Sequence, residues 1–421
     1  MVQNKELPGA YINFVSKAAA DAALSGRGIA TMPLEMDWGA ADKVFTVTNA
    51  DLQKNSMEIF GYAYTDEKLK GLRDLFLNTE VLYGYRLNGG GKKAGNALAE
   101  AAYPGIRGND LRIIVQVNVD DESLFDVKTL FGTSVVDEQT VAGADELAGN
   151  AYVLEASAGI PLTGGENGTV DGAAYQSYLD KIESFSFHTM GAVVTDDTTK
   201  ALFAAFAKRL RNEMGVKFQL VLYDYAKADD PGVISVDNRV LDEGWSEAGL
   251  VYWVTGACAG CAVNRSNQNK KYDGAFTVDT AYTQAQLKDA VKAGKFVLHM
   301  AGTDVRVLED INTMVTTSET QGDIFKDNQT VRVIDQIGND IAVLFNTKYL
   351  GVVPNDAAGR ISLWSDIVAH HRQMEQIRAI EGFADSDITV EPGDTPKAVV
   401  VRDAITVVNA MGRLYMTVMI G

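Results

Sequence analysis

The sequence predicts a chain of several domains that combines α/β and α+β architecture. Its 421 residues exceed what one ordinary core holds. Strand patterns dominate residues 96–180, and strands and helices alternate over residues 181–325. We therefore predict an N-terminal arm (1–25), a small α/β domain (26–95), a β-sandwich-like insertion (96–180), an α/β domain (181–325) and a C-terminal core domain (326–421) that ends in an arm at 413–421.

The first 180 residues hold the small domain and the insertion. In the small domain we expect a strand at Gly28–Leu34, a helix at Lys68–Leu77 and a strand at Val81–Leu87. Short strands at regular intervals favour a sandwich in the insertion, and we predict them at Leu111–Val119, Leu124–Phe131, Ser134–Val141 and Ala151–Glu155.

The order of elements in residues 181–325 indicates a mainly parallel sheet with covering helices. We predict strands at Phe185–Val194, Val216–Tyr225 and Lys295–Met300. We predict helices at Thr198–Met214, Ser246–Val263 and Thr283–Ala293.

Two amphipathic helices open the last quarter of the chain. Apolar residues at three- and four-residue steps predict one helix over Val331–Leu344 and a second over Gly359–Glu381, which Gly382 ends. Together they form an αα-hairpin. Strands at Asp387–Glu391 and Lys397–Arg402 follow it, joined through a Pro-Gly turn.

The chain carries a short strand with two apolar faces near each end, at Leu7–Val15 and Leu414–Ile420. In the terminal strand Leu414, Met416, Val418 and Ile420 share one side, and Tyr415, Thr417 and Met419 share the other. Such a strand has to be paired and covered, because an exposed one invites aggregation. Pairing within its own domain and addition to a sheet of another subunit both remain open.

Composition and charge exclude several classes of protein. The hydrophobic content of 46% is that of a folded globular protein, and no apolar run reaches the roughly eighteen residues that cross a bilayer. The N-terminus lacks the features of a signal peptide, so we expect folding in a cytoplasm. The net charge of −18 argues against binding to nucleic acid. Residues 326–421 hold 9 basic and 12 acidic residues, so this part is nearly neutral and suits contact with other protein.

No motif in the chain signals catalysis. Cys258-x-x-Cys261 could be half of a zinc site or a redox pair, but it lies among small residues of a predicted helix, which favours core packing. His370 and His371 are adjacent on the second amphipathic helix, with no evident partner. The glycines at Asn88–Gly91 and Leu162–Gly168 lack the spacing of a phosphate-binding loop.

Several motifs taken together resemble the contractile tail sheath proteins of phages and phage-tail-like particles, above all those of Gram-positive myophages and related bacteriocins. They are LPGAYINF, GRGIATMPLEMDWGA, AAYPGIRGNDLRI, TGACAGCAVNRSNQNKKYDG, FVLHMAGTDVRVLEDINTM and most of residues 328–421, including VVNAMGRLYMTVMIG. The likeness is weak over residues 114–160, where such sheaths vary.

The resemblance implies a structural protein whose α/β domain is subtilisin-like. Its subunits would stack as hexameric rings around a tail tube, assemble in the bacterial host cytoplasm, and contact baseplate and tail terminator proteins, without cofactor, nucleic acid or membrane insertion. Arms at both ends would complete sheets in neighbouring subunits. The resemblance places the arm contacts at Leu7, Tyr11, Ile12, Phe14, Leu414, Tyr415, Met416, Thr417, Val418, Met419 and Ile420, and tube-facing candidates at Arg360, Arg372 and Arg378.

A competing hypothesis makes the chain a cytosolic α/β enzyme or binding protein with a site near Cys258 and Cys261.

Overall fold

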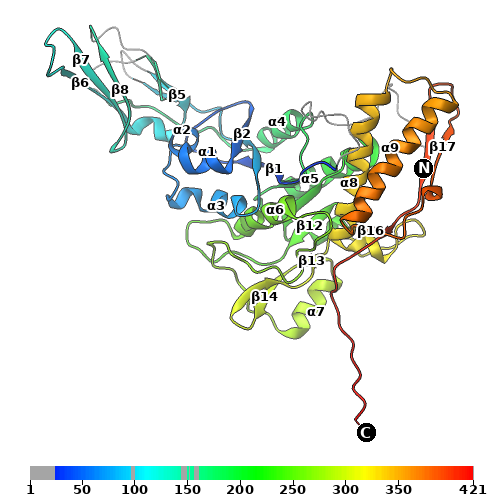
Figure 1. Ribbon diagram of the computed structural model, residues 1–421. Coiled ribbons are helices and arrows are strands. Elements are labelled where there is room, and N and C mark those ends of the chain that lie inside the picture. The colour runs from blue at the N-terminus through cyan, green and yellow to red at the C-terminus, as the bar shows by residue number, and fades with distance from the viewer. Residues whose placement is uncertain (1–23, 96–99, 144–148, 151, 156–160, 421) are drawn as a thin grey trace. The chain divides into compact units, whose positions relative to one another are not determined.

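The computed structural model describes residues 24–95, 100–143, 149–150, 152–155 and 161–420 (Figure 1). The chain forms two compact units. Unit 1 comprises Met1–Ala30, Gly71–Thr79 and Ser184–Gly421, and unit 2 comprises Thr31–Lys70 and Glu80–Glu183. The predicted N-terminal arm, with Leu7, Tyr11, Ile12 and Phe14, lies outside the described residues.

Unit 1 contains the predicted parallel sheet. Neighbouring strands pair in parallel in the order β10 (Thr189–Gly191), β11 (Gln219–Tyr223), β12 (Val233–Val236) and β13 (Lys295–Phe296). The helices of this part are α3 (Lys70–Phe76), α5 (Asp197–Arg209), α6 (Val251–Gly260) and α7 (Gln284–Lys292). The alternation of elements therefore predicted the sheet correctly.

Several predicted elements of this part are shorter or divided. The strand expected at Phe185–Val194 is reduced to three residues, and the one expected at Lys295–Met300 divides into β13 and β14 (Leu298–Ala301), which pairs with β15 (Asp304–Val307) in a separate hairpin. The helix expected from Thr198 ends its α-helical part at Arg209 and closes with a π-helical turn. β12 was not predicted.

Small residues let α6 pack closely against its neighbours. A Cβ atom at Gly191 of β10 would lie 2.1 Å from Thr255 Oγ1 of α6, and one at Gly256 would lie 2.3 Å from the Leu75 carbonyl oxygen of α3. Both glycines are thus fixed by close approach. This explains the run of small residues around Cys258 as packing.

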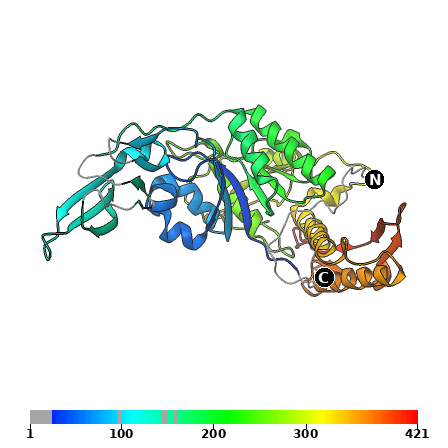
Figure 2. The same ribbon diagram turned by 90° about the horizontal axis from the view of Figure 1, so that it is seen from above.

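The C-terminal part of unit 1 is a helix pair with two small strand pairs. α8 (Asn328–Leu344) and α9 (Ala357–Gln376) lie side by side (Figures 1 and 2). A hairpin of β17 (Ile388–Pro392) and β18 (Val399–Asp403) follows, and β16 (Ile380–Glu381) pairs with β19 (Thr406–Val407). The apolar core of the helix pair includes Leu344, Leu363, Ile367 and Val368.

The second amphipathic helix ends earlier than predicted, at Gln376 rather than Glu381. Arg378 adopts a left-handed backbone with φ of 60°. The amides of Arg378 and Ala379 close back on the carbonyls of Glu375 and Met374, so the chain turns and Ile380 enters a strand.

Unit 2 combines a small α/β part with a β-sandwich. β1 (Ile29–Leu34) runs into this unit from unit 1, and β2 (Val44–Thr48) pairs antiparallel with β3 (Val81–Arg86). The helices α1 (Asn49–Lys54), α2 (Ser56–Phe60) and α4 (Gly172–Ile182) were not predicted, and neither was β2.

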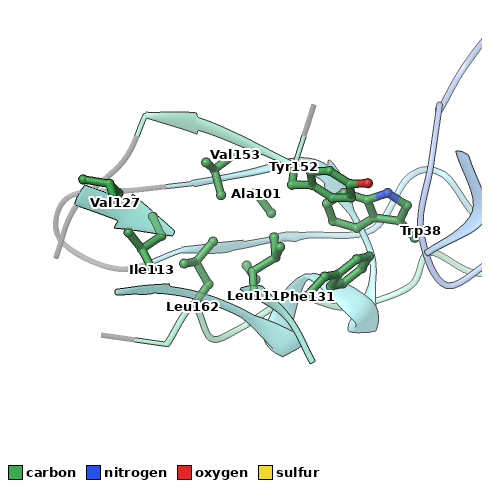
Figure 3. Packing of buried hydrophobic residues seen from close by; sticks show 10 residues of the cluster. Trp38, Ala101, Leu111, Ile113, Val127, Phe131, Tyr152, Val153 and Leu162 are labelled. Carbon is green, nitrogen blue, oxygen red and sulfur yellow. The ribbon is translucent and has the colours of Figure 1, made fainter. Parts of the chain in front are cut away.

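The sandwich consists of two three-stranded sheets. One contains β4 (Lys93–Gly95), β5 (Glu100–Pro104) and β9 (Val153–Glu155), and the other β6 (Leu111–Val117), β7 (Phe125–Phe131) and β8 (Ser134–Val141). Buried side chains of both sheets meet between them, with Trp38 beside Phe131 and Tyr152 (Figure 3). The β-sandwich prediction is therefore confirmed.

Candidate assembly surfaces

The terminal segment is the most exposed apolar stretch of the described chain. Residues 408–420 form no strand, and Leu414, Met419 and Ile420 are 86%, 93% and 94% exposed. Figure 1 shows this segment running on without a neighbouring strand. The strand predicted at Leu414–Ile420 thus finds no partner among the described residues, contrary to pairing within its own domain. Its addition to another subunit stays a prediction.

The residues at the start of this segment, 408–410, are hydrogen-bonded to the first turn of α8. Gln329 Nε2 donates to the Val408 carbonyl at 3.1 Å, and the Ala410 amide donates to Gln329 Oε1 at 2.9 Å. Asn409 Nδ2 donates to Thr330 Oγ1 at 3.0 Å. We define residues 414–420 as the tail, which therefore leaves unit 1 from an anchored point.

The β17–β18 hairpin has a strand edge, that of β18, that the described chain does not fill. The two strands pair only with each other, from Ile388↔Asp403 to Pro392↔Val399. The β17 side is occupied by α9, because Trp364 Nε1 donates to the Ile388 carbonyl at 3.0 Å and Trp364 packs with Ile388 in one core. On β18, Val400 and Val401 are 43% and 38% exposed. β18 is therefore the more open edge.

The three tube-facing candidates do not form one row. Arg360 donates to the Asn355 backbone and side-chain oxygens, both at 3.0 Å. Arg372 Nη2 donates to both carboxylate oxygens of Asp385, at 2.7 and 2.9 Å, in an exposed ion pair. Arg378 is exposed but lies beyond the end of α9, because the helix stops at Gln376. Its placement on the helix was wrong, and the tube contact stays a prediction.

His370 and His371 both have acidic partners that sequence reasoning missed. His370 Nε2 lies 3.0 Å from Asp340 Oδ2 of α8, and His371 Nε2 lies 2.9 Å from Asp403 Oδ2 of β18. Both histidines are 1% or less exposed. The partners are some thirty residues away in opposite directions along the chain, and no local spacing signals them.

Cys258 and Cys261 belong to the packed core. Both are free thiols and buried, and Asn267 Nδ2 lies 3.8 Å from Cys258 Sγ. Burial raises the pKa of both thiols, which keeps them protonated and unreactive at neutral pH. In the described part of the chain, no three His, Cys, Asp or Glu side chains gather as a metal site. Packing therefore accounts for this pair.

No helix among the described residues is long and apolar enough to cross a membrane.

Comparison with known families covers almost the whole chain. Residues 27–87 match the N-terminal region of domain III of the tail sheath protein Gp18. Residues 88–167 match the phage tail sheath protein beta-sandwich domain. Residues 168–313 match the phage tail sheath protein central domain, and residues 320–421 the phage tail sheath C-terminal domain.

Individual relatives agree. The phage-like element PBSX protein XkdK of Bacillus subtilis (strain 168) is 31% identical over 99% of this chain and 97% of its own length. The sheath tail protein of Desulfitobacterium hafniense has a solved structure that is 36% identical, with a TM-score of 0.81 over 95% of this chain and 96% of that one. The sheath tail protein of Listeria innocua is 29% identical, with a TM-score of 0.80 over 91% and 93%.

The matches therefore confirm the family resemblance read from the sequence motifs, and the chain belongs to the phage tail sheath protein family, whose members are structural proteins of phage tails and tail-like particles.

Proposed function

We propose that this chain polymerises into a contractile sheath around a tail tube, as stacked hexameric rings whose subunits exchange terminal strands. The exposed apolar tail carries this proposal, because the same subunit also has an open strand edge at β18. The tail of one subunit would add to the hairpin of a second copy and bury its apolar side chains there.

The dimensions of the two segments are compatible. The seven tail residues span about 23 Å when extended at roughly 3.3 Å per residue. β18 has five residues, so the tail is long enough to pair along its whole edge. Beside the hairpin, Ala357, Arg360, Ile361, Trp364 and Val390 line a cavity of about 260 Å³. Ile361 is 64% exposed there, and a donated apolar side chain would cover it.

The free energies explain why exchange would be collective. Burying Leu414, Met416, Val418 and Ile420 contributes on the order of 6–12 kcal/mol, at roughly 1.5–3 for each side chain. Ordering about eight residues costs roughly 8–16 kcal/mol of backbone entropy. One arm is therefore marginal before its backbone hydrogen bonds form, and a lattice in which every subunit gives and receives strands is stable as a whole.

Contraction is supported by the fold. The helical sheath of the anti-feeding prophage, solved in its contracted state, has a TM-score of 0.59 at 13% identity over 99% of both chains. Family membership supports a tube protein, a baseplate and a tail terminator as partners in a phage or bacteriocin particle assembled in the host cytoplasm. The N-terminal arm, the five-part domain division and the inner position of Arg360, Arg372 and Arg378 belong to the same proposal.

Deletion of Leu414–Gly421 tests the exchange. The truncated subunit should keep its far-ultraviolet circular dichroism and elute as a folded monomer, because α8, α9 and the hairpin do not depend on the tail. It should form no tubes in negative-stain electron microscopy. A folded truncation that still builds tubes would contradict the proposal.

A matched pair of point variants distinguishes a loss of strand pairing from a general effect of an added charge on solubility. Val418→Asp should abolish tubes, because it places a charge in the donated strand. Val119→Asp makes the same change at a valine that is 93% exposed in unit 2, and it should leave tubes intact.

A further inference from the structure

Two adjacent histidines of α9 connect the exit of the N-terminal arm with the hairpin that would receive a donated strand. We propose that His370 and His371 are positioning residues that fix these two places relative to each other. The inference rests on the proposed strand exchange, since the spacing matters only where one subunit gives a strand and receives another.

The first connection runs from the arm exit to His370. Ser25 is the last residue of the predicted arm, and its Oγ donates to Asp340 Oδ1 of α8 at 2.6 Å. Gln336 Nε2 contacts both Ser25 Oγ, at 2.7 Å, and Asp340 Oδ2, at 2.9 Å. Leu24 packs against the apolar core that contains Val333 and Ile337. His370 Nε2 then joins Asp340 to α9 at 3.0 Å.

The second connection runs from His371 to the receiving strand. Asp403 is the last residue of β18, and its Oδ2 lies 2.9 Å from His371 Nε2. The contact is within ion-pair distance, although its geometry falls outside that of an aligned hydrogen bond. His371 Nδ1 lies 3.0 Å from the Ile367 carbonyl oxygen. Both ring nitrogens of His371 thus face an oxygen atom, Nε2 that of Asp403 on β18 and Nδ1 that of Ile367 on α9.

Because His370 and His371 are adjacent, their rings contact two different elements. Successive residues of a helix point about 100° apart, so one dipeptide can hold α8 with one ring and β18 with the next. The ring centroids are 5.4 Å apart, and the Phe383 ring lies 5.2 Å from that of His371. Both imidazoles are buried, so the two rings themselves are shielded from water, although Asp403 also reaches solvent.

Asparagine and glutamine variants separate positioning from packing. A glutamine side-chain nitrogen reaches about as far as Nε2 of histidine, whereas that of asparagine reaches only as far as Nδ1. His371→Asn should therefore release Asp403, and His371→Gln should hold it. His370→Asn and His370→Gln should differ in the same way at Asp340.

Hydrogen–deuterium exchange on the free subunit gives the readout. We expect His371→Asn to raise amide exchange of β18 at least tenfold and that of residues 24–28 less than threefold. His371→Gln should raise the exchange of β18 less than threefold. We expect His370→Asn to raise exchange at residues 24–28 instead. Both asparagine variants should lower the yield of tubes at least tenfold, and both glutamine variants should restore it.

A double-mutant cycle gives the second measurement. Asp403→Asn should add less than a twofold further rise in β18 exchange to His371→Asn, because the contact is already lost. Equal exchange in the asparagine and glutamine variants, or full additivity with Asp403→Asn, would overturn the proposal. The exchange measurements need no assembled sheath, so they are independent of the tail deletion that tests strand exchange.

Discussion

Asp335 of α8 accepts two parallel hydrogen bonds from the Arg211 guanidinium, at 2.7 and 2.9 Å. Both side chains are only 7% exposed. Arg211 follows α5 of the parallel-sheet part, so this pair fastens the C-terminal helix pair to it. A second buried pair joins Arg332 of the same helix to Asp310, which precedes the helix, at 2.6 Å.

Removing one partner of the buried Arg211–Asp335 pair should lower the stability of the subunit strongly. We expect Asp335→Asn to lower the free energy of unfolding by about 3–5 kcal/mol, because it leaves a buried guanidinium without a countercharge. Asp385→Asn removes the partner of Arg372 in an exposed pair, with side chains 59% and 44% exposed, and should cost about 0–1 kcal/mol. Urea unfolding of both variants measures the difference. Equal losses would show that the Arg211 pair does not fasten the two parts.

Acid should destabilise the subunit through His188. Burial, together with the charge of Arg27, lowers the pKa of His188 to about 3. The unfolded histidine has a pKa of about 6.5, so between these values the unfolded state binds a proton that the folded state does not. The free energy of unfolding therefore falls as the pH drops from about 6.5 to about 3.

The matching variant is His188→Asn, whose Oδ1 can still accept from the Ile29 amide, now 3.2 Å from His188 Nδ1. Between pH 7 and pH 4.5 the native chain should lose about 2–3 kcal/mol more stability than this variant in urea titrations. Identical pH dependence in the two chains would exclude His188 as the cause.

The cysteines should be dispensable for assembly. Cys258→Ala together with Cys261→Ala should cost about 1–2 kcal/mol and leave tube formation intact, since the pair only fills space. Gly256→Ala, in the same helix, should cost more, because its Cβ would meet the Leu75 carbonyl. Thiol titration should detect neither cysteine before unfolding. Bound zinc in stoichiometric amount, or a redox-active dithiol, would contradict the packing assignment.

Charge reversal tests the tube contact. Arg372→Glu with Arg378→Glu should weaken sheath assembly on purified tubes more than self-association of the sheath protein alone. Arg239→Glu is the matched control, because Arg239 is 58% exposed and paired with Asp279, much as Arg372 is paired with Asp385. Equal effects of the double variant in both assays would remove the tube assignment.

Helices and strands could be predicted from the sequence where apolar residues recur at a regular helical or strand period. The period of Val331, Ile337 and Leu344 predicted α8, and alternation predicted β6, β7 and β8 to within two residues. Short buried elements carry no such period. β12 has four residues, all buried, and β10 has three, so their pairing with neighbours defines them more than their own sequence does.

The assembly surfaces were readable only in part. The tail residues stood out because both faces of Leu414–Ile420 are largely apolar and the predicted strand is the last element of the chain. The end of α9 at Arg378 was missed, because a left-handed arginine gives no signal comparable to glycine. The partners of His370 and His371 come from α8 and β18, and only folding brings them together.

The separate positions of the tail and β18 give the proposed polymer a direction. In the proposed sheath each subunit would offer a strand from beyond β19 to one neighbour and accept one at β18 from another, so the contact would be head-to-tail rather than self-complementary. A filament built from such contacts has polarity. Its first subunits would display empty edges and its last would display unaccepted tails, so the two ends would need different capping proteins and would elongate at different rates.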